Sequence, residues 1–205
     1  DLSPFFEGHI WGDDDIPSLQ LMTDAVHKHG ALAGIELSYN GRDASNLYSR
    51  AAPFDLFSRG LVGGSGYEPG QSRAATKDDL KQIRKWHRNA AIRAKKAGFD
   101  IIYCYAAHNL TLAFHLLSKD NDRADEYGGS LENRTRFFRE LIEDTKEAVG
   151  DTCAVAVRFA VDELIGADGM QFDGEAHDIV AMLAEHPDLW DVNVSSWKND
   201  STTSR

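Results

Sequence analysis

Four short segments of the chain are almost continuously apolar, and longer amphipathic segments separate them. The apolar segments cover residues 31–37, 99–106, 153–161 and 189–196. Apolar runs of this length, bounded by turn residues, predict β-strands that are buried on both faces. Such strands are typical of a parallel sheet that is covered by helices.

Amphipathic helices are predicted before each of these strands, over residues 15–30, 77–98, 130–150 and 174–186. Glycine ends three of the four patterns, and Ser130 stands where an N-cap residue is expected. Helices and strands therefore alternate strictly along the chain. This order predicts an α/β fold built from parallel βα units.

Two architectures have this order. A doubly wound nucleotide-binding fold expects a GxGxxG turn directly after its first strand, but the glycine-rich residues 60–70 follow no predicted strand. We interpret residues 60–70 as a loop. A TIM barrel instead predicts polar groups at the carboxyl ends of several strands, where the active sites of such barrels lie.

The predicted strands meet this expectation. Because side chains alternate along a strand, each strand has one face that leads to a polar or amphipathic side chain at its carboxyl end. These side chains are Glu36, Tyr105, Arg158 and, just after the last strand, Trp197. Buried charges need partners, so we expect a shared polar ligand at the barrel mouth.

The chemistry of two of these residues suggests the ligand. The guanidinium of Arg158 suits a ring carbonyl or a nitrogen that gains negative charge, and Glu36 can accept from a ring N–H. Together they suit an electron-accepting heterocycle. An internal ion pair between Glu36 and Arg158, or exposure of both strand ends, remains the alternative.

The composition of the chain limits the classes of partner that it is expected to bind. The chain has 205 residues, and its 22 basic residues are outnumbered by 33 acidic ones, giving a formal charge of -11. This balance opposes binding to nucleic acid or to an anionic membrane, so a small-molecule substrate is expected. Cys104 and Cys153 lie in apolar runs and form no metal-binding pattern, which favours reduced thiols and a cytoplasmic setting.

The two ends of the sequence have an unusual form. The chain begins without a methionine in an acidic, loop-like segment, and it stops soon after a predicted strand with no helix to cover that strand. We therefore expect the chain to be an internal piece of a longer protein.

The run NDRADEYGGSLENRTRF, residues 121–137, resembles the signature of the old yellow enzyme family of FMN-dependent TIM-barrel oxidoreductases. The motif is long and specific, and the resemblance extends over nearly the whole chain. It implies a partial TIM (β/α)8 barrel that covers about strands 3 to 6. Residues 1–205 would then be part of a single FMN-binding domain, with Glu36 and Arg158 matching positions that contact the flavin pyrimidine ring.

The end of the second predicted strand separates branches of this family. Most ene-reductases have His-x-x-His or His-x-x-Asn there, whereas this chain has Tyr105 and His108. This departure resembles the branch of trimethylamine, dimethylamine and histamine dehydrogenases, in which an Asp after strand six joins the pair. Asp200 matches that acid, and Trp197 resembles the aromatic wall that contacts the substrate amine.

The resemblance implies an FMN-dependent oxidoreductase that oxidises or demethylates a small methylated amine by hydride transfer to flavin N5. The alternatives are an NAD(P)H-dependent flavin oxidoreductase or ene-reductase, with Tyr105 as proton donor, and a non-catalytic flavin-binding barrel fragment. A 4Fe-4S cluster would have to lie beyond Arg205. A homo-oligomer and an electron-acceptor protein remain open.

Overall fold

The computed structural model describes residues 8–43, 51–63 and 69–194 and centres them on a parallel sheet. The sheet has four strands in the order β1-β5-β6-β7. These strands are β1 (Gly34–Leu37), β5 (Ile101–Ala106), β6 (Ala154–Asp162) and β7 (Leu189–Val194). Each predicted strand is therefore confirmed, within a few residues at its ends.

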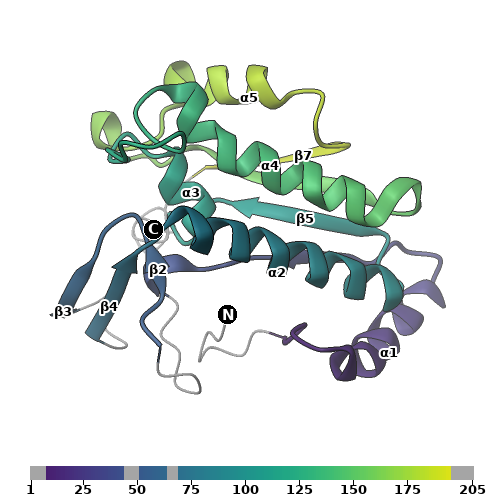
Figure 1. The fold of residues 1–205 in the computed structure, drawn as a ribbon. Coiled ribbons are helices and arrows are strands. Elements are labelled where there is room, and N and C mark those ends of the chain that lie inside the picture. The colour runs from purple at the N-terminus through teal and green to yellow at the C-terminus, as the bar shows by residue number, and fades with distance from the viewer. Residues whose placement is uncertain (1–7, 44–50, 64–68, 195–205) are drawn as a thin grey trace.

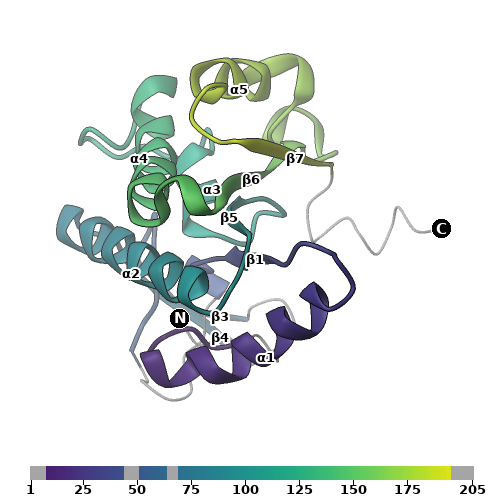
Figure 2. The same cartoon turned by 90° about the vertical axis from the view of Figure 1, so that its right-hand side faces the viewer.

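Helices cover one face of this sheet. They are α1 (Ile16–His27), α2 (Lys77–Lys96), α4 (Leu131–Val149) and α5 (His177–Leu183), and they form an outer arc around the curved sheet (Figure 2). Within the described part of the chain, no helix has the length and apolar character needed to cross a membrane. All four predicted helices are confirmed.

Local chemistry explains where these helices begin and end. The Ser130 side chain accepts a hydrogen bond from the Asn133 backbone N–H and caps α4, as predicted. Gly98 follows α2 with a φ of +89°, and a Cβ there would lie 3.0 Å from the Thr23 hydroxyl oxygen. A left-handed turn with so little space strongly favours glycine.

The core lies between the sheet and the helices. Alternate side chains of β5 and β6 point toward α2 and α4 and are almost fully buried. The largest contributors to this layer are Ile102, Val155, Val157, Phe159, Leu80, Phe137, Phe138 and Ile142. The opposite parity of the same strands carries the candidate functional groups, so the core fixes their direction.

The interpretation of residues 60–70 as a loop is wrong at both of its ends. β3 (Arg59–Gly63) and β4 (Pro69–Ala74) pair antiparallel, and β2 (Phe54–Asp55) pairs parallel with β4. These strands form a second sheet in the order β2-β4-β3. The strands are short and rich in glycine and polar residues, so no hydrophobic alternation marks them.

Several short helical segments complete the described fold. The helix α3 (Leu112–Leu117) follows β5, and Figure 1 places it beside the small sheet at the carboxyl end of β5. Single turns of 3-10 helix occur at Asp13–Asp15, Gly41–Asp43, Gly150–Thr152 and Gly166–Asp168, and a π-helical turn at Phe172–Ala176. Of these segments, Phe172–Ala176 falls in part within a predicted helix, the one over residues 174–186.

Candidate functional site

An ion-pair network joins β1, β6 and β7 on the sheet face away from the helices. Arg158 on β6 places Nη1 3.0 Å from Glu36 Oε2 on β1, and its Nε and Nη2 each lie 2.8 Å from Asp191 Oδ2 on β7. The Glu36–Arg158 ion pair, which the sequence left as the alternative to a shared ligand, is formed. Asp191 is a third member of this network. Sequence reasoning missed it, although Asp191 and Asn193 are polar residues on the same face of β7.

The Arg158 guanidinium is charged and partly exposed to solvent. Burial lowers the pKa of Arg158, but the Asp191 hydrogen bond and the negative charges of Glu36 and Asp191 outweigh it and leave the pKa above its usual value. The side chains of Arg158 and Glu36 are 38% and 37% exposed. Both groups can therefore reach a ligand on this face.

This donor and acceptor set fits the pyrimidine ring of a flavin. Each Nη of Arg158 makes one of the contacts above and carries a second hydrogen that can be donated to a ring carbonyl. The Glu36 carboxylate can accept from a ring N–H. Glu36 and Arg158 are therefore the described residues best suited to hold such a ring.

Tyr105 and His108 meet beside this network. Tyr105 ends β5, pairs in register with Arg158, and is 7% exposed. Its hydroxyl shares a hydrogen bond with His108 Nδ1, and the two ring centroids are 5.9 Å apart. The structure thus brings the two predicted catalytic residues into direct contact at the strand end.

The backbone of this corner is unusual, where "the corner" denotes residues 105–109. His108 and Asn109 have φ values of +58° and +57°, in the left-handed region. Each such residue costs about 1 kcal/mol or more outside glycine, with Asn the better tolerated. Because the two residues are consecutive, neighbouring contacts must hold the turn.

Three such contacts come from neighbouring segments. Arg42 Nη2 donates to Asn109 Oδ1 at 3.0 Å, and the His115 ring Nε2 lies 3.1 Å from the Asn109 carbonyl oxygen. The Thr111 hydroxyl donates to the Tyr105 carbonyl at 3.1 Å and also caps α3. Contacts from both sides therefore fix the His108–Asn109 turn.

Two predicted site residues, Trp197 and Asp200, lie outside the described residues. Their proposed contacts with the substrate stay predictions. Sequence reasoning also missed Asp55 and His115, which are buried next to the corner. A histidine in the apolar run of residues 112–117 was the one available signal for them.

A cavity among the described residues overlaps this site only in part. It has a volume of about 760 Å³ and touches Glu36 and Tyr105. Most of its wall comes from β1, α1 and α2 on the helix side of the sheet, including Leu19, Met22 and Trp86. Arg158 and His108 do not line it, so we assign the site from the strand ends and not from this cavity.

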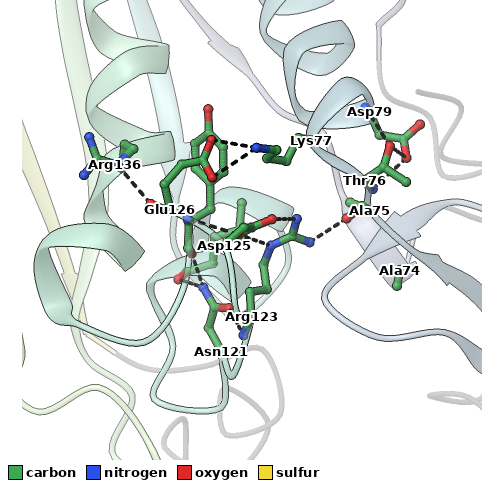
Figure 3. A network of polar contacts seen from close by, with 12 residues as sticks. Ala74, Ala75, Thr76, Lys77, Asp79, Asn121, Arg123, Asp125, Glu126 and Arg136 are labelled. Carbon is green, nitrogen blue, oxygen red and sulfur yellow. Dashed lines mark hydrogen bonds and ion pairs between the residues drawn. The ribbon is translucent and has the colours of Figure 1, made fainter.

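The signature segment, residues 121–137, lies apart from the Glu36–Arg158–Asp191 network. Asn121 Nδ2 donates to the Leu116 and Tyr127 carbonyls, each at 2.7 Å. Arg123 pairs with Asp125 and donates to the Ala75 carbonyl between the small sheet and α2, as Figure 3 shows. These contacts hold the segment in a compact shape and connect it to Ala75, between β4 and α2.

Further contacts at this segment have the same character. Lys77 pairs with Glu126 at 3.2 Å, and Arg136 donates to the Glu126 carbonyl (Figure 3). Arg134 donates to the Leu117 and Gly129 carbonyls and pairs with Glu175 at 2.6 Å. Arg134 closes the loop onto α4. The signature segment is a structural support.

Comparisons with known proteins place the chain in a family. The model of the NADH:flavin oxidoreductase / NADH oxidase family matches residues 6–202. Dimethylamine dehydrogenase of Hyphomicrobium sp. (strain x) is 34% identical over 96% of this chain and 27% of its own length. The chain thus spans less than a third of that relative.

Solved structures agree with this assignment. Histamine dehydrogenase from Rhizobium sp. 4-9 is 46% identical with a TM-score of 0.88, covering 97% of this chain and 29% of its own. The 6-hydroxypseudooxynicotine amine oxidase from Pseudomonas geniculata N1 is 42% identical with a TM-score of 0.91, covering 98% and 30%. The predicted partial TIM-barrel fold is confirmed. The chain belongs to the NADH:flavin oxidoreductase / NADH oxidase family, the old yellow enzyme family, and within it to the amine dehydrogenase-like branch.

Proposed function

We propose that the protein containing this chain is an FMN-dependent oxidoreductase that oxidises or demethylates a small methylated amine. The observation that carries the proposal is the hydrogen bond between Tyr105 and His108 at the end of β5, beside the Glu36–Arg158 pair. The similarity to dimethylamine and histamine dehydrogenases supports it. Residues 1–205 are, in this proposal, part of one flavin-binding barrel domain.

The flavin supplies an acceptor at N5 for the hydride that leaves the α-carbon of the amine. An amine gives up this hydride only when its nitrogen is unprotonated. Tyr105 and His108 favour the neutral amine because the Tyr105 oxygen can take the amine's proton as its own hydroxyl proton passes to His108 Nδ1. Loss of hydride leaves an iminium ion, and water converts it to an aldehyde and the shortened amine.

Two further residues complete the substrate side of the proposal. Asp200 acts with Tyr105 and His108 as the acidic member of the set, and Trp197 forms an aromatic wall. An aromatic face attracts a methylammonium group through cation–π interaction. Both roles rest on the resemblance alone, because these residues lie outside the described part of the chain.

The cofactor side rests on Glu36 and Arg158. The positive charge of Arg158 stabilises the negative charge that the pyrimidine ring gains on reduction. An electron-acceptor protein must then reoxidise the flavin. A 4Fe-4S cluster on this route would need ligands outside the chain, because its cysteines are Cys104 and Cys153 alone. Assembly of the protein as a homo-oligomer remains part of the proposal.

A second function has a specific observation in its favour. The family that matches the chain is described as NADH:flavin oxidoreductase, so the flavin could take its hydride from NAD(P)H. In that case Tyr105 would serve as a proton donor to an activated alkene. The two functions differ in which reductant bleaches the flavin.

The test is an anaerobic reduction of the full-length protein with flavin bound, followed at roughly 450 nm, where oxidised flavin absorbs. Secondary and tertiary methylamines are mixed with one sample and NAD(P)H with another. The proposal predicts rapid bleaching by an amine. Bleaching by NAD(P)H alone would favour the second function, and no bleaching by either would leave a non-catalytic flavin-binding protein.

A further inference from the structure

A buried acid–histidine pair lies directly behind the corner. Asp55 ends β2 in the small sheet, and His115 lies on α3; their side chains are 0% and 2% exposed. His115 Nδ1 is 3.0 Å from Asp55 Oδ1. The pair joins segments 60 residues apart in the sequence. It ties the small sheet to the carboxyl end of β5.

Both ring nitrogens of His115 have a hydrogen-bond partner. Its other ring nitrogen, Nε2, lies 3.1 Å from the Asn109 carbonyl oxygen, which can only accept. Burial raises the pKa of Asp55, but the hydrogen bond and charge of His115 outweigh it and leave that pKa below its usual value. Asp55 is therefore ionised and accepts as well. Each ring nitrogen of His115 therefore contacts an oxygen, Asp55 Oδ1 on one side and the Asn109 carbonyl on the other.

Charged groups from two other segments face this pair. Arg42, which follows β1, lowers the pKa of Asp55 by its positive charge. Glu163, which follows β6, is buried, and burial raises its pKa while the charge of His115 acts in the opposite direction. The His115 ring thus lies in a polar cluster that also contains Asp55, Glu163 and Arg42.

The His115 contact acts at the strained point of the corner. The carbonyl it holds belongs to Asn109, whose φ is +57°, and the preceding residue His108 has φ +58°. Arg42 holds the Asn109 side chain from the other side. Fixing the Asn109 peptide fixes the direction of the His108 side chain toward the Tyr105 hydroxyl, because the two residues share one turn.

We propose that Asp55 and His115 are positioning residues that hold the His108–Asn109 turn and so keep the His108 imidazole in contact with the Tyr105 hydroxyl. This inference rests on the proposed function of Tyr105 and His108. The Asp55–His115 pair acts through the Asn109 carbonyl and does not itself contact substrate. It would make the small sheet a part of the site's support.

The experiment uses the full-length protein with flavin bound and the variants Asp55→Asn and His115→Gln. Asp55→Asn keeps the side-chain size and replaces the carboxylate that contacts His115 Nδ1 with a neutral amide. His87→Gln is the matched control. His87 is also a buried histidine, but it lies on α2 on the helix side, with Nε2 3.6 Å from Cys104 Sγ.

Two readouts separate positioning from stability. The first is the pH profile of flavin reduction by an amine, and the second is the nitrogen-15 resonance of the His108 ring, assigned with His108→Gln. Both test variants should slow reduction by about tenfold to a hundredfold, shift the pH profile, and move the His108 resonance. The double variant should lose less than the sum of the two, and His87→Gln should change neither readout.

The outcomes distinguish this inference from the proposed function. If the wild-type protein oxidises no amine but Asp55→Asn still moves the His108 resonance, the proposed function fails and the positioning role stands. If Asp55→Asn folds with an unchanged His108 resonance and pH profile, the positioning role is wrong, whatever its stability. Should His115→Gln fail to fold, Asp55→Asn decides by the same criteria.

Discussion

The signature segment and the corner both follow β5 but use their polar groups in opposite ways. In the signature segment, Asn121, Arg123 and Arg134 direct their donors to backbone carbonyls and nearby acids. In the corner, Tyr105 and His108 contact one another beside the strand-end ion pairs. The motif that identifies the family therefore supports the fold, while Tyr105 on β5 and His108 in the turn after it form the candidate site.

This difference has a physical basis. A loop whose donors end on backbone carbonyls constrains residue types strongly, because each loss leaves a buried acceptor without a partner. A substrate-facing loop is constrained by the chemistry of its ligand. Residues that support the fold and residues that contact the substrate should therefore respond differently to substitution. The three predictions below test this difference between the signature segment and the corner.

The largest effect is expected for Arg134→Met in the signature segment. The Arg134 side chain is 7% exposed and holds two carbonyls and Glu175, so its loss should lower the free energy of unfolding by about 3 kcal/mol. Lys81→Met is the control, since Lys81 pairs with Asp78 on the exposed surface of α2. Denaturant unfolding measures both, and equal effects of the two would contradict the support role.

Glycine substitutions in the same segment should have an intermediate effect. A Cβ on Gly128 would lie 2.4 Å from the Arg123 carbonyl oxygen, so Gly128→Ala should cost about 2 kcal/mol through forced displacement. Gly129 has φ +79° but open space around it, so Gly129→Ala should cost only about 1 kcal/mol. Thermal unfolding of the two variants checks which substitution costs more. If Gly129→Ala cost more than Gly128→Ala, the loop would have shifted to accommodate the new Cβ at position 128.

The smallest effect on stability is expected in the corner. Asn109 has a φ of +57°, so Asn109→Ala should cost about 1 kcal/mol, while Asn109→Gly should relieve the backbone strain. Both lose the Arg42 contact with the side chain. The difference between the two unfolding free energies therefore isolates the backbone term. No difference would show that the turn is not under strain.

Much of the fold could be predicted from the sequence because its main strands are apolar runs. β5 and β6 follow this pattern within a residue or two, and the glycine that follows α2 marks its end. The small sheet could not be predicted, since β2 has two residues and residues 60–70 lack alternation. Pairing over long distances in the sequence leaves no local signal.

The candidate site, like the fold, could be predicted from the sequence only in part. Strand parity predicted Glu36, Tyr105 and Arg158 on one face, and the Glu36–Arg158 contact bears this out. Asp55 and His115 are brought together only by the small sheet and α3, so no spacing in the sequence pairs them. The catalytic roles of Tyr105 and His108 came from the resemblance and stay predictions.

The central claim is that the corner carries the chemistry and the signature segment does not. The most direct measurement is rapid-mixing flavin reduction of the full-length protein by a methylated amine across about pH 6 to 10, the range in which His and Tyr titrate. Tyr105→Phe, His108→Gln and Arg134→Met are compared with the wild type. We expect shifted pH profiles for the first two and an unshifted profile for folded Arg134→Met. Unshifted profiles for Tyr105→Phe and His108→Gln, or an equal shift in all three variants, would contradict the account.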